Sequence, residues 1–303
     1  MKNTPEKKKK MLYAAKRTTL PYIYQLPTIL LLVLLMLLPI IMVVRYSLYD
    51  NVIMNQNPVF VGLKNYSTVL KDETFIISLG NTLYFTLMSV IFHLIIGMVF
   101  ALLLNSKMTP AVMRSLFRVF YIIPWVFTAT IIAIIWRLIL NPNGIINFIL
   151  QFLHFIDTGV EWFASTRTAL HAVTFVNIWA GYPFYMVSLL AGLQGVPEDL
   201  YEAATIDGAN EGRKFISITI PHLMPIIISI SMLDFIWTMQ VFALVWMTTG
   251  GGPIHATEVL GTYTYKAAFS RYQFSAASAS AVIILIISMA VAFLYIQHQK
   301  TRD

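Results

Sequence analysis

The stretch LPTILLLVLLMLLPIIMVV, residues 26–44, contains no charged side chain. A helix rises about 1.5 Å per residue, so a hydrocarbon core about 30 Å thick requires about 20 apolar residues. This run has close to that length. It is followed by Arg45 and Tyr46 rather than by the small residues of a cleavage site, so we expect a retained transmembrane helix rather than a signal peptide.

The composition extends this interpretation to the whole chain. Of 303 residues, 58% are hydrophobic and only 12% are charged, whereas about 25% are charged in an ordinary soluble domain. The same length criterion predicts five further spans, at residues 76–104, 120–140, 170–193, 226–247 and 276–296. The expected fold is therefore an all-α membrane protein with six transmembrane helices. The absence of cysteine excludes disulfides, thiolate metal sites and a cysteine nucleophile.

Basic residues indicate the orientation. The net charge is +7, and lysines at positions 7–10 with Lys16 and Arg17 crowd the segment before the first span. Such a cluster is more typical of a topology signal than of a nucleic-acid site, and it predicts that both termini are cytoplasmic. We therefore expect a basic cytoplasmic arm at 1–25, a six-span permease domain at 26–297 and a cytoplasmic tail at 298–303. The expected location is the cell membrane.

Residues 194–225 join the fourth and fifth predicted spans and read QGVPEDLYEAATIDGANEGRKFISITIPHLMP. Pro197 suits the first turn of a helix, and the acids directly after it place negative charge near the positive helix end. Gly208 supplies the positive φ that a sharp turn needs. A second helix is predicted to begin near Ala209 and to end before Pro221. The pattern indicates a short helix–turn–helix on the cytoplasmic face.

The charge of this loop separates two interpretations of it. A helix that rests on the bilayer surface favours Lys and Arg on its polar face. This loop has only two bases, Arg213 and Lys214, against five acids: Glu198, Asp199, Glu202, Asp207 and Glu211. The excess of acids favours docking to a basic groove of a soluble protein.

The same loop resembles the EAA loop of bacterial ABC importer permeases. The resemblance rests on Glu202, Ala203 and Ala204, then Asp207, Gly208 and Ala209, then Phe215, Pro221 and Pro225. In that family the loop forms the coupling helix that sits in the ATPase subunit. By resemblance, Glu202 pairs with a basic residue of the ATPase, Gly208 makes the turn, and Phe215 packs the second helix against the membrane domain.

Other segments resemble the maltose/glycerol-phosphate-type permeases in their compact six-helix form. They include the sequence VGL at 61–63, Asn81 with Thr82, and the sequence TGGGP at 249–253 followed by ATE at 256–258. By resemblance, the flexible external loop of Gly250, Gly251, Gly252 and Pro253 borders the gate and a solute-binding protein. The resemblance covers roughly residues 20–296.

Polar residues inside spans are candidates for a solute pathway. The fourth span carries Asn177, Trp179, Gly181 and Phe184, in a segment that resembles one that contacts sugar in the family. Aromatic faces suit the C–H-rich surfaces of sugars, and amides match hydroxyls. The alternative is helix packing, with Gly181 as a site of close approach.

In the fifth span, Asp234, Trp237, Thr238 and Val241 share one helix face. Asp234 is the only acid deep in a predicted span, and it departs from the small polar and aromatic residues of the family. It either contacts the solute or forms a structural ion pair, for which Arg137 is a candidate. His93 in the second span is interpreted as an interior histidine with satisfied hydrogen bonds.

Two other functional classes are disfavoured. No nucleophile elbow or phosphate-loop spacing is present, so we expect no enzyme activity and no metal site here, with ATP and Mg bound by partner ATPase subunits. An ion-coupled carrier usually has inverted repeats and several buried ionisable groups. The resemblance implies half of a sugar-import pore, with a homologous second permease, two ATPase subunits and a binding protein as partners. The alternative solutes are glycerol-3-phosphate and a polyol.

Overall fold

The computed structural model describes residues 20, 22, 24–50, 52–106 and 110–300. The basic cluster at 7–17 lies outside these residues. Within them the chain is helical, and the extended pairing is limited to one isolated bridge between Tyr49 and Phe60. The predicted all-α class is confirmed.

Five uninterrupted helices are long and apolar enough to cross a membrane, namely Tyr24–Ser47, Glu73–Asn105, Ala169–Gln194, Glu211–Met239 and Phe274–Gln297. A sixth span is available if a bent helix pair counts as one. The elements are α2 (Leu38–Ser47), α3 (Lys64–Lys71), α4 (Glu73–Asn105), α5 (Ala111–Val126), α6 (Ala129–Ile139), α7 (Ile145–Phe152), α8 (Ala169–Gln194), α9 (Glu198–Ile206), α10 (Glu211–Lys214), α11 (Ile220–Met239), α12 (Ala243–Thr248), α13 (Leu260–Tyr265) and α14 (Phe274–Lys300).

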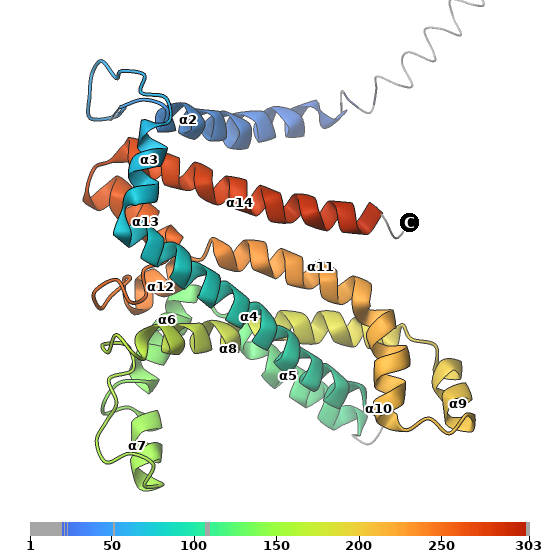
Figure 1. Cartoon of the computed structure of the whole chain (residues 1–303). Coiled ribbons are helices and arrows are strands. Elements are labelled where there is room, and N and C mark those ends of the chain that lie inside the picture. The colour runs from blue at the N-terminus through green and yellow to red at the C-terminus, as the bar shows by residue number, and fades with distance from the viewer. Residues whose placement is uncertain (1–19, 21, 23, 51, 107–109, 301–303) are drawn as a thin grey trace, which may run out of the picture.

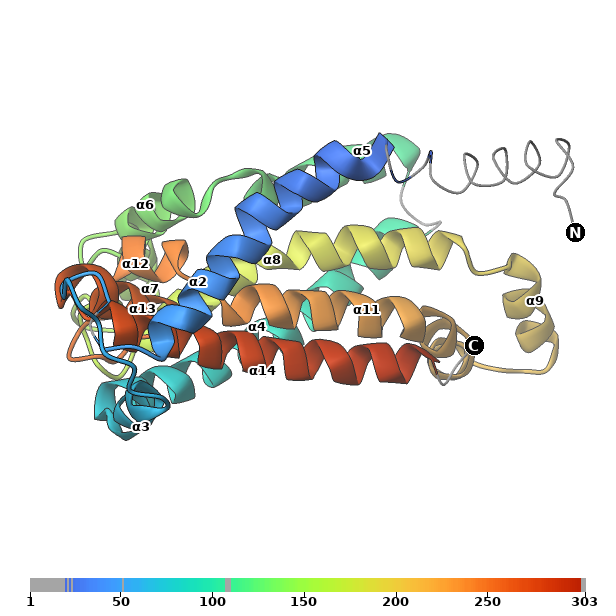
Figure 2. The same cartoon turned by 90° about the horizontal axis from the view of Figure 1, so that it is seen from above.

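The long helices run side by side, and their connections gather at two opposite ends (Figures 1 and 2). One end carries α9, α10 and the C-terminal end of α14, together with the first residues of the helix that leads into α2. The other end carries α3, α7, α12 and α13. The α9–α10 segment therefore lies at the same end as both ends of the described chain. The predicted boundary of the tail, between residues 297 and 298, falls inside α14.

Helices α4 and α8 form the centre of the fold and make the most extensive helix contact. Asp72 caps the start of α4, and its Oδ1 accepts the Thr74 amide at 2.8 Å. The buried face of α4 carries many small and polar residues, namely Ser78, Thr82, Thr86, Ser89, His93 and Gly97, beside the large apolar residues Phe75, Phe85, Met98 and Leu104. Small residues let helix backbones approach closely in a membrane, where lipid already solvates the large apolar ones.

The prediction of one continuous helix for the third span, residues 120–140, is wrong. Helices α5 and α6 meet at a bend of 100°. Pro124 removes one backbone donor near the end of α5. Thr128 then caps α6, its side chain accepting the Ile131 amide at 3.5 Å. A hydropathy scan passes over such a break because both halves are apolar.

The prediction that the second helix of the loop ends before Pro221 is also wrong. The chain is helical from Glu211 to Met239 and passes through both Pro221 and Pro225. Residues Phe215–Thr219 form a π-helical turn directly before Pro221, and this wider turn is one of the ways in which a helix accommodates irregular backbone bonding. The span then stops at Met239, earlier than the predicted residue 247, and α12 follows after a short break.

Candidate functional site

A cavity of about 430 Å³, with a few polar side chains in a mostly apolar wall, lies among α4, α5, α6, α8, α11 and α12. Its volume falls within the range of about 300–1,000 Å³ that is typical of small-molecule sites. Five of the predicted pathway residues line it: Asn177, Gly181, Asp234, Thr238 and Val241. The fold thus brings together residues of the fourth and fifth spans that the sequence proposed separately.

Two helix breaks border the cavity. Phe127 and Ala129 flank the α5–α6 bend, and Val241 to Ala243 form the break between α11 and α12. Backbone groups freed by such breaks are tolerated at membrane depth only beside protein or a water-filled space. Both breaks therefore lie where such irregular backbone is tolerated, beside the cavity.

A buried hydrogen-bond network forms one side of the cavity. His93 Nδ1 lies 2.8 Å from Asp234 Oδ2, and the His93 Nε2 lies 3.0 Å from the backbone oxygen of Asn177. Tyr185 donates to the same Asp234 oxygen at 3.0 Å, and Thr238 donates to Asp234 Oδ1 at 2.9 Å. His93 and Asp234 are 2% and 8% exposed. The network therefore joins α4, α8 and α11.

Asp234 thus has structural partners, and they differ from the one suggested by the sequence. Its carboxylate is held by His93, Tyr185 and Thr238, while Arg137 is exposed on α6. The interpretation of His93 as an interior histidine with satisfied hydrogen bonds agrees with its two contacts. Asp234 also lines the cavity, so structural contact and access to a solute coexist at this residue.

Three predicted pathway residues lie away from the cavity wall. Trp179 packs edge-on against Trp136, with ring centroids 5.3 Å apart, in a neighbouring hydrophobic cluster. Phe184 lies between Trp125 and Trp237, at centroid distances of 6.1 and 5.9 Å. Trp237 is 58% exposed. These rings extend an aromatic surface from the cavity toward the outside of this chain.

Helix α9 and the turn after it form a hairpin with α10, here called the α9–α10 hairpin (Glu198–Lys214). It projects from the end of the bundle (Figure 1). Gly208 has φ +76°, and the Ala209 amide bonds to the Ala204 oxygen at 2.9 Å. Asn210 caps α10 by accepting the Arg213 amide at 2.8 Å. The predicted turn at Gly208 is therefore present.

The hairpin exposes acidic and apolar side chains together. Glu202, Ala203 and Asp207 are exposed, and Ile206 is 87% exposed. Glu202 also borders a cleft of about 380 Å³ between α9 and the ends of α4 and α8. A surface with this mixture lacks a partner within the described chain.

The return from the hairpin is anchored in the bundle. Phe215 packs against a buried cluster that includes Met98, Leu189 and Leu223. The Tyr201 hydroxyl lies 2.9 Å from Thr219 Oγ1 and ties α9 to the helix that follows α10. Pro221, which the sequence placed among the docking residues, is exposed within α11.

The glycine loop at 250–253 lies at the opposite end of the bundle. Gly250 and Gly251 have φ values of +60° and +87°. Gly251 packs on the fully buried Glu258, whose Oε2 lies 2.5 Å from Lys266 Nζ. Thr257 Oγ1 donates to the Gly252 oxygen at 2.7 Å. These bonds leave the loop less freedom than its glycines suggest, and the sequence reasoning missed the Glu258–Lys266 pair.

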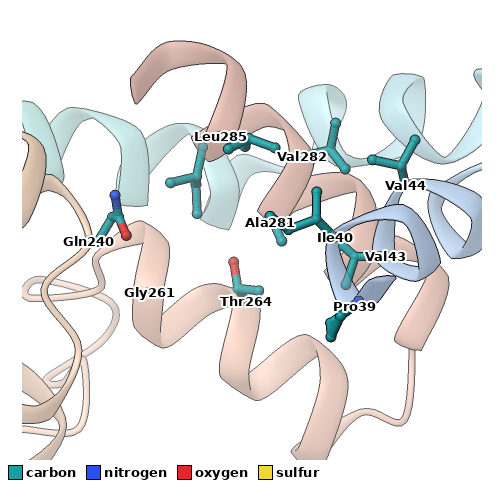
Figure 3. Close-up of a pocket in the computed structure, with 11 residues that line it drawn as sticks. Pro39, Ile40, Val43, Val44, Gln240, Gly261, Thr264, Ala281, Val282 and Leu285 are labelled. Atoms are coloured by element: carbon teal, nitrogen blue, oxygen red, sulfur yellow. The ribbon is translucent and has the colours of Figure 1, made fainter. Parts of the chain in front are cut away.

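A further cavity of about 440 Å³ lies between α2, α13 and α14 (Figure 3). Its wall is mostly aliphatic, with Ile40 and Val43 facing Ala281 and Val282. Gln240 and Thr264 are the polar side chains at its edge. Without a charged group or a polar network, this cavity is less suited than the His93–Asp234 cavity to a polar solute.

Sequence reasoning missed Tyr185 and Ser89 as members of the polar network. Asn177 Nδ2 donates to Ser89 Oγ at 2.9 Å. A usable signal was the recurrence of polar residues every fourth position in the second span, at Ser89 and His93. Their partners could not be assigned, because the helix register depends on packing.

Comparisons with known proteins place this geometry in a family. Residues 74–302 match the family described as binding-protein-dependent transport system inner membrane component. The chain is 36% identical over 243 residues to the trehalose/maltose transport system permease protein MalF of Thermococcus litoralis, a match that covers 80% of this chain and 81% of that protein.

Two further likenesses support the same placement. The chain is 33% identical to the sulfoquinovosyl glycerol transport system permease protein SmoG of Agrobacterium fabrum over 279 residues, or 91% of this chain and 89% of that one. Its fold matches a chain of a bacterial ABC transporter involved in the import of the acidic polysaccharide alginate. That match has a TM-score of 0.82 at 21% identity and covers 97% of this chain and 99% of the other.

Proposed function

Because this chain belongs to the family of binding-protein-dependent transport system inner membrane components, we propose that it forms half of the transmembrane pathway of an ATP-driven importer for a carbohydrate. The chain is a multi-pass membrane protein and an ABC transporter permease.

The cavity supports a carbohydrate as the solute. Its wall combines the amide of Asn177 and the hydroxyl of Thr238 with the aromatic rings of Trp125 and Phe127. Carbohydrates present hydroxyl groups at their edges and C–H groups on their faces, so they need both kinds of contact. The curated relatives named above are transport proteins for trehalose/maltose and for sulfoquinovosyl glycerol.

The α9–α10 hairpin supports energy coupling from another protein. Its exposed acids, Glu202 and Asp207, suit a basic groove, and the exposed Ile206 suits an apolar pocket beside it. We assign this groove to an ATP-binding-cassette subunit, which binds ATP and Mg and hydrolyses the nucleotide. The permease itself then performs no chemistry.

One structural relationship carries the proposal. The hairpin directly joins α8 and α11, and these two helices supply Asn177, Gly181, Asp234 and Thr238 to the cavity. About 20 Å of helix separates Gly181 from the end of α8. A movement of the hairpin is therefore transmitted to the cavity wall along two continuous helical segments, as alternating access between two states requires.

The other partners follow from the same architecture. A homologous permease completes the pathway, and its contact surface includes the aromatic residues Phe184 and Trp237. A solute-binding protein docks at the end that carries the 250–253 loop, opposite the hairpin. In this arrangement the α9–α10 hairpin and both termini are cytoplasmic.

The test is reconstitution of the whole transporter in liposomes with its binding protein and with ATP on the ATPase side. We expect ATP-dependent accumulation of labelled neutral disaccharides such as maltose or trehalose. Accumulation by this chain without the ATPase subunits would contradict the proposal. Coupled import restricted to solutes other than carbohydrates would contradict the solute class.

A further inference from the structure

The His93 imidazole lies between two hydrogen-bond acceptors. Its Nδ1 faces the carboxylate oxygen Asp234 Oδ2 at 2.8 Å, and its Nε2 faces the Asn177 backbone oxygen at 3.0 Å. A backbone carbonyl has no hydrogen to donate, so Nε2 must carry one. The contact between Nδ1 and Oδ2 needs a second hydrogen, which belongs either to the ring or to the carboxyl group.

These two hydrogens determine the charge of the pair. If both reside on the ring, His93 is an imidazolium and Asp234 is a carboxylate. If one resides on the carboxyl group, both residues are neutral. In either case the net charge of the pair is zero. Tyr185 and Thr238 also donate to Asp234, so both carboxyl oxygens have hydrogen-bond partners.

Gly181 keeps this pair in place. A Cβ atom at position 181 would overlap the His93 ring, so only glycine lets the imidazole approach the α8 backbone. On α4, Gly97 likewise allows Tyr185 to pack close, because a Cβ there would lie 2.5 Å from the Tyr185 Cβ. The backbone of both helices is therefore shaped around the groups that surround Asp234.

The rest of the cavity wall contains no other ionisable side chain among the described residues that line it. A lone carboxylate among membrane-spanning helices would attract cations and would be strongly unfavourable to bury. Because His93 balances its charge, the Asp234 carboxylate can accept hydrogen bonds while the pair stays neutral overall. Apart from His93, whose two ring nitrogens already face Asp234 and the Asn177 oxygen, the described wall offers no basic side chain to an anion.

We propose that His93 is a specificity-determining positioning residue: it neutralises and orients Asp234, so that this chain's half of the pathway accepts an uncharged polyhydroxylated solute and disfavours both cations and anions. The inference rests on the proposed function and narrows its solute class. The net neutrality of the His93–Asp234 pair, rather than the charge of the carboxylate alone, is what the protein requires.

Four versions of the complete transporter test this claim, namely the parent, His93→Gln, Asp234→Asn and the double variant. His93→Gln leaves a buried carboxylate uncompensated, so we expect its melting temperature in detergent to fall by about 10 °C. Asp234→Asn leaves a neutral histidine that can still bond to both partners, so we expect a melting temperature near that of the parent. The melting temperature of the double variant should lie closer to that of the parent than to that of His93→Gln.

The opposite pattern would overturn the proposal. One such result is a melting temperature of Asp234→Asn that falls as far as that of His93→Gln. Another is a double variant whose melting temperature is no higher than that of His93→Gln. In either case the carboxylate is needed for its own charge. A merely structural role for His93 predicts no recovery in the double variant. This readout requires no knowledge of the natural solute.

Uptake by the reconstituted transporter tests the specificity. We expect ATP-dependent uptake of maltose or trehalose by the parent transporter but at least tenfold less uptake of glycerol 3-phosphate. Efficient uptake of glycerol 3-phosphate by the parent would refute the charge filter while leaving an ATP-driven importer intact. Uptake of every probe without ATP would instead refute the proposed function, while the melting temperatures would still decide whether the pair is neutral.

Discussion

His93 of α4 lies directly against Gly181 of α8, so closely that a methyl group on the glycine would overlap the imidazole. The contact belongs to a regular series between two parallel helices. Ser89 bonds to Asn177, and Gly97 packs on Tyr185, each pair being 88 residues apart in sequence. The two helices thus meet in one register, with a small residue opposite each large one.

The first prediction concerns this contact. Gly181→Ala should displace the His93 ring and break its 3.0 Å bond to the Asn177 oxygen. We expect a loss of about 2–4 kcal/mol from overpacking and the lost hydrogen bond, measured as a lower melting temperature of the purified transporter. Gly80→Ala is the matched control, because no atom lies within 4 Å of its added carbon. Equal stability of the two variants would contradict the close contact.

The second prediction concerns docking of the α9–α10 hairpin. Glu202→Lys places a positive charge where a basic groove is proposed, and like charges at an interface cost several kcal/mol. We expect uptake and solute-stimulated ATP hydrolysis to fall more than about tenfold, with normal insertion of the chain into the membrane. Glu161→Lys, an exposed acid in the loop between α7 and α8, should leave both activities unchanged. Normal uptake by Glu202→Lys would remove the docking assignment.

The third prediction concerns the turn in the hairpin. Gly208 has φ +76° and no atom within 4 Å of an added Cβ, so the cost of Gly208→Ala is backbone strain alone. That strain amounts to roughly 1–2 kcal/mol, and it should be smaller for Gly208→Asn. Hydrogen exchange of the Ala209 amide, which bonds to the Ala204 oxygen, should accelerate by about tenfold in Gly208→Ala. Gly212→Ala, at an ordinary backbone conformation, should leave this exchange unchanged.

The fourth prediction concerns the buried pair beneath the glycine loop. Glu258 is fully buried, and the Lys266 side chain is 25% exposed. Removing one partner of a fully buried pair costs about 3–5 kcal/mol, and partial exposure of Lys266 lowers our expectation for Glu258→Gln to about 2–3 kcal/mol. Thermal unfolding of the transporter measures this loss. Glu211→Gln, which breaks the surface pair with Lys214, should cost less than about 1 kcal/mol.

Local sequence features predicted a good part of this molecule. The apolar spans, the turn at Gly208 and the acids at the start of α9 each depend on a few neighbouring residues. The break at Phe127 and Thr128 was missed, because hydropathy records how apolar a segment is and not where its backbone bonds are interrupted. The helical passage through Pro221 was missed because a π-helical turn compensates for the missing donor.

The sequence by itself determined that this chain is helical, spans a membrane and carries an acidic hairpin, because composition, periodicity and a short motif are properties of the chain in order. Only the tertiary structure decided that Asp234 meets His93 and Tyr185 instead of Arg137, and that Asn177, Gly181 and Thr238 share one cavity. Those contacts join residues far apart in sequence. They depend on the helix register, which is set by the packing of small residues against large ones across α4, α8 and α11.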